Sequence, residues 1–426
     1  VFTAPAVKGK AIIVDKQIQI SFKYDADLVA IVKSLSQRKY NPDNKTWTCI
    51  LSIALEVISK LSGLIEIDQA RIDLAGKQNE LASMSRKLES DFEVPGLKGE
   101  LMPFQRASVE FVNKAEGRAI VSDEQGLGKT IIALAYMQLH PEMRPVVIVV
   151  PASLKINWFR EANKWLSTNE RYYIVNGGKT FDLSLTGASI VLINYDILAK
   201  WKDQIIQFAP KLIICDEAHR LKNLNGSKGS QRAVAAKEIS KKCKTMLMTG
   251  TPVVNRPIEL YSLLNIIDPA AWGNRWSFIQ NFCNPKHNGF GWDFSGASNL
   301  DKLHEKIKPW VVRHLKKDVL TELPEKRYSP VIFQLGKKAK ADYDAVVSGA
   351  KQAIKNSLAA KKPANALAEI ERLTQAAAVA KLPACIEWIN DFIDTGEKLV
   401  VFATHKFVID ALMAEYGNIA VKVDGS

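Results

Sequence analysis

The chain has 426 residues, 47% of them hydrophobic and 24% charged, which suffices for two or three ordinary domains. Its 58 basic and 45 acidic residues give a net charge of +13 that is spread along the chain and suits a polyanionic partner. No apolar run approaches the roughly 18 residues that cross a membrane. Five scattered cysteines argue against a zinc knuckle or a disulfide framework, so we expect an intracellular protein of a reducing compartment without an export signal.

The first 65 residues differ from the rest of the chain in their pattern of short strand-like and helix-like segments. Residues 17–22 alternate polar and apolar side chains, residues 27–35 are helix-like, and residues 39–47 predict a turn that enters another strand. We therefore expect a small α+β domain over 1–65. A charged, leucine-punctuated helical connector is expected over 66–98.

A phosphate-binding loop is predicted at 123–130, where Asp-Glu-Gln-Gly-Leu-Gly-Lys-Thr separates a strand-like run from a helical run. Lys129 would bind the β and γ oxygens, and the Thr130 hydroxyl would ligate Mg²⁺. The common pattern has glycine where this chain has Asp123, but the groups that touch phosphate are kept. The pattern indicates ATP, with a plain glycine turn as the alternative; the glycines assigned to the loop are Gly126 and Gly128.

An acidic pair follows another strongly apolar run, residues 211–215. Acidic catalysts of open α/β sheets lie at such strand ends. Asp216 would help to hold Mg²⁺, and Glu217 would orient and deprotonate the water that attacks the γ-phosphate. We expect His219 to link the nucleotide to neighbouring motifs. The alternative for the pair is a solvated loop.

Further apolar runs at 146–150, 189–194 and 246–248 alternate with helical segments and end in polar loops. This order predicts a mostly parallel sheet flanked by helices, with the nucleotide site along one edge. Residues 255–310 are dense in aromatic side chains. Stacking on unpaired bases is one interpretation of these aromatics; a helical protrusion with an aromatic core is the one we favour.

The remaining residues predict helices and then strands. Residues 337–382 are rich in Ala, Lys and Glu, and 365–382 have the spacing of an amphipathic packing helix, preceded by a turn at 361–363. Residues 398–403 predict a buried strand, and 421–426 the next strand and turn. A parallel sheet of two strands would leave an exposed edge and face, so we expect the chain to be a fragment of a longer protein.

Taken in order, these segments resemble the motifs of helicase superfamily 2, and in detail those of the SWI/SNF-type family of double-stranded DNA translocases. Residues 123–130 resemble motif I of that family, 216–219 motif II, and 247–252 with Asn255 motif III. RNA helicases of the superfamily usually carry Ser-Ala-Thr in motif III, so this segment favours a DNA motor. The resemblance implies RecA-like lobes, of which the second is only partly present, because counterparts of motifs V and VI are missing.

The resemblance also implies roles for individual residues. Gln105 matches the segment that contacts adenine. Residues 312–319 and 323–326 are similar to the family's link into the second lobe. The family usually has two adjacent arginines in this link. Here the first is Arg313 and the second is replaced by His314, to which we assign no role. The residues implied to face DNA or to couple hydrolysis to movement are Asn157, Trp158, Asn194, Thr249, Gly250 and Thr251.

The N-terminal region resembles the HARP domain of fork-remodelling, strand-annealing members of the same family. Lys39, Tyr40, Pro42 and Trp47 carry this match. The side chains expected to contact DNA are Lys33, Arg38, Lys39, Lys45 and Trp47. The alternative is a small α+β cap in which Trp47 is only core.

These observations predict an ATP- and Mg²⁺-dependent translocase on duplex or forked DNA, which acts without sequence preference and reverses forks or anneals strands. We expect a monomer without membrane contact, and single-strand-binding, replication or repair proteins as candidate partners. The alternatives are another superfamily 2 motor, such as an RNA helicase or a restriction-system subunit, and a DNA-binding protein with an inactive ATPase fold. The expected domains beyond the connector are a first lobe at 99–254, helical protrusions and a link at 255–382, and the start of a second lobe at 383–426.

Overall fold

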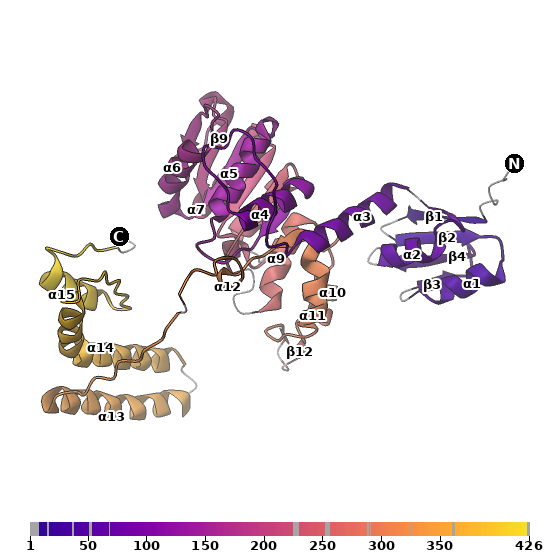
Figure 1. Cartoon of the computed structure of the whole chain (residues 1–426). Coiled ribbons are helices and arrows are strands. Elements are labelled where there is room, and N and C mark those ends of the chain that lie inside the picture. The colour runs from indigo at the N-terminus through magenta and orange to yellow at the C-terminus, as the bar shows by residue number, and fades with distance from the viewer. Residues whose placement is uncertain are drawn as a thin grey trace. The chain divides into compact units, whose positions relative to one another are not determined.

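The computed structural model describes residues 8–14, 17–35, 38–50, 53–67, 69–224, 230–251, 256–287, 289, 291–324, 326–359 and 363–423. Its contacts divide the chain into two units, residues 1–324 and 325–426, whose elements are labelled in Figure 1. The residues that carried predictions but lie outside the described residues are Pro252, Asn255, Glu325, 361–362 and 424–426. No described helix is long and apolar enough to span a lipid bilayer.

The N-terminal region forms a five-stranded sheet in the order β3-β4-β2-β1-β5. The strand predicted at 17–22 and the helix predicted near 27–35 are both present. The elements are β1 (Gly9–Val14), β2 (Gln17–Phe22), α1 (Ala26–Lys33), β3 (Arg38–Asn41), β4 (Thr46–Ile50), α2 (Ala54–Leu61) and β5 (Glu66–Ile67). Ile20, Leu28, Val32 and Leu61 lie in a hydrophobic core of this region's own residues, as expected for a small α+β domain.

Helices α3 (Gln69–Met84) and α4 (Pro103–Lys114) lead into a seven-stranded sheet. Its order is β14-β6-β11-β10-β7-β9-β8, and all its neighbouring strands are parallel. The predicted parallel α/β sheet is therefore confirmed. The strands are β6 (Ala119–Val121), β7 (Val146–Val150), β8 (Tyr172–Ile174), β9 (Ile190–Asn194), β10 (Leu212–Asp216), β11 (Lys244–Met248) and β14 (Val311–Val312).

Side chains of the central strands alternate between two hydrophobic cores, because successive residues of a strand point to opposite faces. Along β7, Val147 and Val149 enter one core, whereas Val146, Ile148 and Val150 enter the other. Every residue of β7, β9 and β10 is buried, as expected for parallel strands that are covered on both faces.

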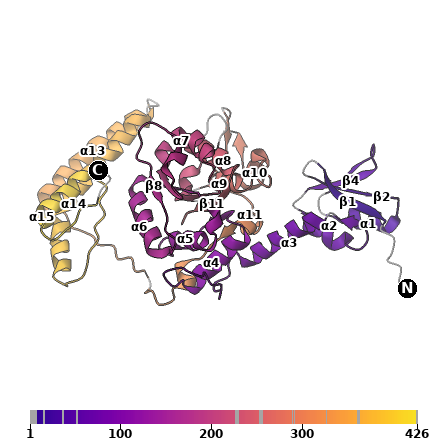
Figure 2. The ribbon, with the colours of Figure 1, turned by 90° about the horizontal axis from the view of Figure 1, so that it is seen from above.

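Figure 2 shows the helices that cover the two faces. One layer contains α4, α5 (Lys129–Leu139) and α6 (Lys155–Trp165), and the other contains α7 (Tyr195–Phe208), α8 (Gln231–Ser240) and α9 (Pro257–Ile267). Beyond α9 lie α10 (Arg275–Phe282), the hairpin of β12 (Lys286–His287) and β13 (Trp292–Asp293), α11 (Leu300–Ile307) and α12 (Lys316–Val319).

The second unit consists of α13 (Lys337–Ala359), α14 (Pro363–Ile393) and α15 (Lys406–Tyr416). The helix predicted at 365–382 is present, but Leu367 and Ile370 on its predicted packing face are exposed, because the contacts with α13 leave part of that stripe uncovered.

The buried strand predicted at 398–403 is wrong. These residues form no regular element, and Phe402 is 92% exposed. Residues 421–423, the start of the second predicted strand, are likewise irregular and exposed. A β-strand needs a partner for its backbone groups, and the described residues of this unit contain no other strand to supply one.

Candidate nucleotide-binding site

The candidate site lies where three neighbouring strands end. Strands β6, β11 and β10 are adjacent and parallel, so the loops after Val121, Met248 and Asp216 leave the same edge of the sheet. Ligands of open α/β sheets bind outside this carboxyl edge. The phosphate loop, the acidic pair and the Thr249–Thr251 segment, which are far apart in the sequence, therefore meet at one place.

The phosphate loop has the backbone that its glycines permit. Gly126 and Gly128 have φ angles of +87° and +79°, which side-chain-bearing residues rarely adopt, and Gly128 is the N-cap of α5. Helix α5 thus begins at Lys129, with Thr130 in its first turn. The free N–H groups and the dipole of a helix N-terminus favour a bound phosphate at this point.

Lys129 is buried, and its ammonium lies against the loop itself. Its Nζ donates to the main-chain carbonyls of Asp123 at 3.0 Å and Glu124 at 3.4 Å. Burial lowers the pKa of Lys129, whereas the carboxylates of Glu217, Asp123 and Asp216 act in the opposite direction. Main-chain carbonyls are modest partners for a buried ammonium, so a phosphate oxygen would be a stronger one.

The acidic pair comes from the end of β10. Asp216 is buried; its Oδ2 accepts the indole N–H of Trp158 at 2.9 Å, and its Oδ1 accepts the main-chain N–H of Glu217 at 2.9 Å. Burial raises the pKa of Asp216, and the hydrogen bond from Trp158 opposes that shift. Glu217 has a φ of +51°, a conformation that stores strain and is typical of functional positions.

His219 joins this pair to the end of β11. Its Nδ1 lies 3.2 Å from Glu217 Oε2 and 3.4 Å from the Thr249 hydroxyl. Gly250 follows and lies against the phosphate loop: a Cβ at this position would stand 3.3 Å from Lys129 Nζ. The structure thus brings the predicted motif I, II and III residues into contact range.

Gln105 in α4 packs against the phosphate loop. Its Nε2 donates to the Leu127 carbonyl at 3.1 Å, and its Oε1 accepts the main-chain N–H of Met102, the N-cap of α4, at 3.0 Å. A Cβ on Gly128 would stand 2.5 Å from Gln105 Nε2. Gln105 therefore lies beside the loop, as its expected role in nucleotide binding requires.

A buried ion pair beneath the loop escaped the sequence analysis. His314 Nδ1 lies 2.8 Å from Asp123 Oδ1, and both side chains are inaccessible to solvent. The other ring nitrogen, Nε2, lies 2.9 Å from the Lys87 carbonyl, and Ser108 donates to Asp123 Oδ2 at 3.0 Å. Because both ring nitrogens face acceptors, the doubly protonated ring satisfies the site best.

The pKa of His314 agrees with this geometry. Burial by itself lowers it, but the hydrogen bond and charge of Asp123 and the Lys87 carbonyl outweigh burial and leave the pKa raised. The only signal in the sequence was Asp123, which stands where the common phosphate-loop pattern has glycine. Its partner, 191 residues away, could not be identified from spacing.

The segment after β14 makes further contacts with the loop. The main-chain N–H of Lys316 donates to Glu124 Oε2 at 2.8 Å, and Arg313 Nη1 donates to the Ser122 hydroxyl at 3.3 Å. The Lys316 side chain lies over Gly126, where a Cβ would stand 3.2 Å from its Nζ. The expected link into the second lobe is thus fastened to the phosphate loop.

Residues expected to face DNA separate into buried and exposed ones. The prediction that Trp158 faces DNA is wrong. Its position in α6 turns it toward the sheet, where it is fully buried and donates a hydrogen bond to Asp216, so it presents no surface to DNA. Asn157 is exposed, whereas Asn194 is buried at the N-cap of α7, where its Nδ2 donates to Asp196 at 3.2 Å.

The predicted DNA-contact residues of the N-terminal region do not lie in one place. Arg38, Lys39 and Trp47 line one shallow hollow with Tyr40, whose ring centroid is 4.9 Å from that of Trp47. Lys45 lines a different hollow. Lys33 is exposed at the end of α1.

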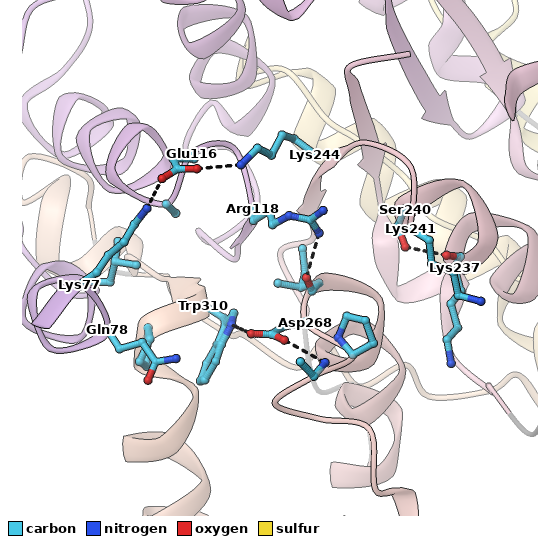
Figure 3. A pocket seen from close by; sticks show the side chains of 16 residues that line it. Lys77, Gln78, Glu116, Arg118, Lys237, Ser240, Lys241, Lys244, Asp268 and Trp310 are labelled. Atoms are coloured by element: carbon cyan, nitrogen blue, oxygen red, sulfur yellow. Dashed lines mark hydrogen bonds and ion pairs between the residues drawn. The ribbon is translucent and has the colours of Figure 1, made fainter. Parts of the chain in front are cut away.

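A separate cavity of about 440 Å³ lies at the opposite, amino edge of the large sheet (Figure 3). Most of its charges are already paired. Glu116 binds both Lys77 and Lys244, and Arg118 donates to the main-chain carbonyls of Cys243 and Ile267. These cations thus already have partners, and the cavity lies at the edge of the sheet opposite to the phosphate loop.

The sequence pattern of the SNF2-related domain matches residues 104–380, well over half of the chain. The "SWI/SNF-related matrix-associated actin-dependent regulator of chromatin subfamily A-like protein 1" of Xenopus tropicalis is 29% identical, over 99% of this chain and 45% of that protein. The "DNA annealing helicase and endonuclease ZRANB3" of Homo sapiens is 30% identical, over 79% of this chain and 32% of that protein. The chain thus spans less than half the length of these relatives.

A solved structure, the "Sulfolobus solfataricus SWI2/SNF2 ATPase core in complex with dsDNA", is also similar. It is 24% identical, with a TM-score of 0.46 over 76% of this chain and 72% of that one. The motifs, the parallel sheet and the match over 104–380 lead to one conclusion: the chain belongs to the SNF2-related domain family.

Proposed function

We propose that the protein hydrolyses ATP and uses the energy to move along duplex or forked DNA. The observation that carries the proposal is the convergence of the phosphate loop, Asp216 and Glu217 at one edge of the sheet. Lys129 would exchange its main-chain partners for the β- and γ-phosphate oxygens.

Glu217 has the environment of a general base. Its Oε2 is buried, and His219 Nδ1 lies 3.2 Å from it. A carboxylate has lone pairs beyond this one contact, so Glu217 can also accept a proton from the attacking water. Glu217 would orient that water in line with the γ-phosphate, and His219 would hold the Glu217 side chain in place.

The donor set fits Mg²⁺. This ion usually takes one or two protein oxygens and completes its shell with water and substrate phosphates. The Thr130 hydroxyl, in the first turn of α5, and the Asp216 carboxylate, at the end of β10, would hold the cation in the presence of nucleotide. When bound, Mg²⁺ would neutralise charge on the β- and γ-phosphates.

DNA is the proposed track for two reasons. Two relatives carry "chromatin" or "DNA annealing helicase" in their names, and the chain has a net charge of +13. Fork reversal or strand annealing is the proposed outcome. The first 65 residues are the proposed DNA-binding domain: Arg38, Lys39 and Trp47 would contact DNA in one hollow, and Lys33 and Lys45 would bind phosphates outside it.

Steady-state ATP hydrolysis tests the proposal. The rate is measured without nucleic acid and with duplex DNA, forked DNA, single-stranded DNA or RNA. Stimulation by duplex or forked DNA that disappears in Lys129→Ala and Glu217→Gln is the expected result. Stimulation by RNA alone would instead indicate an RNA motor, and DNA binding without turnover under any condition would indicate an inactive ATPase fold.

A further inference from the structure

The aromatic segment between α9 and α11 separates into a buried part and an exposed part. Trp272, Phe278 and Phe282 are buried, as the favoured interpretation predicted, but they belong to the core of the large sheet and not to a separate core of a protrusion. Trp276 and Trp292 are different, because they are 41% and 51% exposed. Large aromatic side chains that are exposed side by side indicate an interaction surface.

The two exposed tryptophans belong to a continuous cluster of rings, in which Phe294 is half-buried. The ring centroids of Trp276 and Trp292 are 5.4 Å apart, with their planes at 76°. Phe294 lies 6.1 Å from Trp276 on one side, and His287 lies 5.3 Å from Trp292 on the other. An edge-to-face contact occupies only one face of one ring, so the 41% and 51% exposed tryptophans keep surface that is available for stacking.

Basic side chains surround this cluster. Lys222, Arg256 and Arg275 line a hollow of about 460 Å³ together with Trp292 and Phe294. Arg275 lies over the Phe294 ring at 5.4 Å, and Lys286 is paired in register with Asp293 in the β12–β13 hairpin. The carboxylates of the hollow are Glu259, 3.8 Å from Lys222, and Asp293, which accepts the amide and hydroxyl of Ser295.

The hollow also adjoins the candidate ATP site along the chain. Lys222 and Asn223, which line it, follow directly after the short helix η5 (Ala218–Leu221), whose N-cap is Glu217. In Figure 1 the β12 hairpin lies at the far end of α10 and α11 from α5. The surface therefore reaches from a projecting hairpin back to the segment that follows the acidic pair.

We propose that Trp276 and Trp292, supported by Phe294, form a stacking platform for unpaired bases of single-stranded DNA, with Arg256 and Arg275 binding the flanking phosphates. Aromatic faces beside cations are how sequence-tolerant proteins hold single strands, because every base has a π-face. Bases within a duplex are stacked on one another and cannot use such a platform. The proposal rests on the proposed DNA motor and adds to it the single-stranded part of a fork as a ligand.

Equilibrium binding of a fluorescent oligothymidylate, followed by anisotropy, tests the platform in the whole protein. Stacking of one base on an aromatic ring predicts a roughly 5- to 150-fold loss of affinity in Trp292→Ala and in Trp276→Ala. Trp292→Phe keeps an aromatic face and should recover most of the affinity. Trp388→Ala is the matched control, because Trp388 is similarly exposed in the second unit.

Two further readouts separate this platform from a general effect. Binding of the oligonucleotide should quench tryptophan fluorescence in the wild type and less in Trp292→Ala, whereas affinity for blunt duplex DNA should not change. Arg256→Gln should reduce the salt dependence of oligonucleotide binding by roughly 0.7 in the log–log slope for each lost phosphate contact.

Two results would overturn the platform. One is unchanged oligonucleotide affinity in both tryptophan variants, which would assign the patch to another kind of partner. The other is an equal loss for single-stranded and duplex DNA. A wild type whose ATP hydrolysis does not respond to any DNA would instead defeat the proposed motor, so the two failures can be told apart.

Discussion

Replacing His314 by alanine tests whether the buried pair with Asp123 holds the phosphate loop. The change removes the ring contacts to Asp123 and to the Lys87 carbonyl, at 2.8 and 2.9 Å, inside a region closed to solvent. Breaking a buried ion pair from one side costs about 3–5 kcal/mol. Asp123 would keep the Ser108 hydroxyl and the main-chain N–H of residue 314, so we expect the lower end, about 3 kcal/mol.

Urea unfolding followed by tryptophan fluorescence measures this loss. With a urea dependence of about 3 kcal/mol per molar, the midpoint should fall by about 1 M. His304→Ala is the control, because His304 is exposed and its loss should change the free energy of unfolding by less than about 0.5 kcal/mol.

The contribution of His314 to the free energy of unfolding should also depend on pH. Its pKa is raised above the ordinary value of 6.5, so its protonated form is favoured in the folded protein. The stabilisation is complete below pH 6.5 and is lost as the pH rises through the folded-state pKa. The difference between wild type and His314→Ala should therefore shrink toward alkaline pH. In His314→Arg, which carries a cation at every pH, this pH dependence should vanish. A loss below about 1 kcal/mol at pH 6, or one that grows with pH, would refute the reasoning.

Three further changes test other contacts. Gly128→Ala should weaken the binding of a non-hydrolysable ATP analogue, measured by calorimetry, at least about tenfold. The new Cβ would stand 2.5 Å from the Gln105 side-chain amide, and the backbone has a φ of +79°, which alanine rarely adopts. Gly178→Ala is the control, because Gly178 has the same φ but open space around it, and it should leave the affinity unchanged. Trp158→Phe removes the 2.9 Å hydrogen bond to Asp216, worth about 1.5–3 kcal/mol, and should raise the Mg²⁺ concentration for half-maximal ATP hydrolysis about tenfold; an unchanged requirement would contradict this. The hydrogen bonds and charges of Lys244 and Lys77 lower the pKa of Glu116 to about 2. Glu116→Gln should therefore reduce the free energy of unfolding above pH 4.5, and this loss should fade as the pH falls toward 2. Because the Glu116 side chain is 57% exposed, a loss of more than about 1 kcal/mol in urea unfolding would contradict this reasoning.

Local patterns predicted the centre of the site, because its chemistry depends on short segments. The loop at 123–130 and the acidic pair after β10 each carry their signal within a few residues, and parallel strands place them together. The prediction for Trp158 was wrong because the sequence of the motif does not show whether this side chain points toward DNA or into the core.

The other differences between the sequence predictions and the structure come from long-range contacts and from strands that lack a pairing partner. His314 and Asp123 are separated by 191 residues, and no periodicity links them. The apolar run at 398–403 has the composition of a strand, but hydrophobicity does not supply the neighbour whose backbone must pair with it.

The pairing of β14 with β6 has a consequence for protein synthesis. The N–H groups of Ser122 and Glu124 find their acceptors at the carbonyls of Val312 and His314, about 190 residues later in the chain. On the ribosome, the nucleotide loop therefore emerges long before the segment that completes it. Until then β6 is an open edge, and contacts of such large sequence separation form slowly. Chaperone demand during translation should thus be greatest between these two points, and a nascent chain arrested before residue 312 should expose this edge to aggregation.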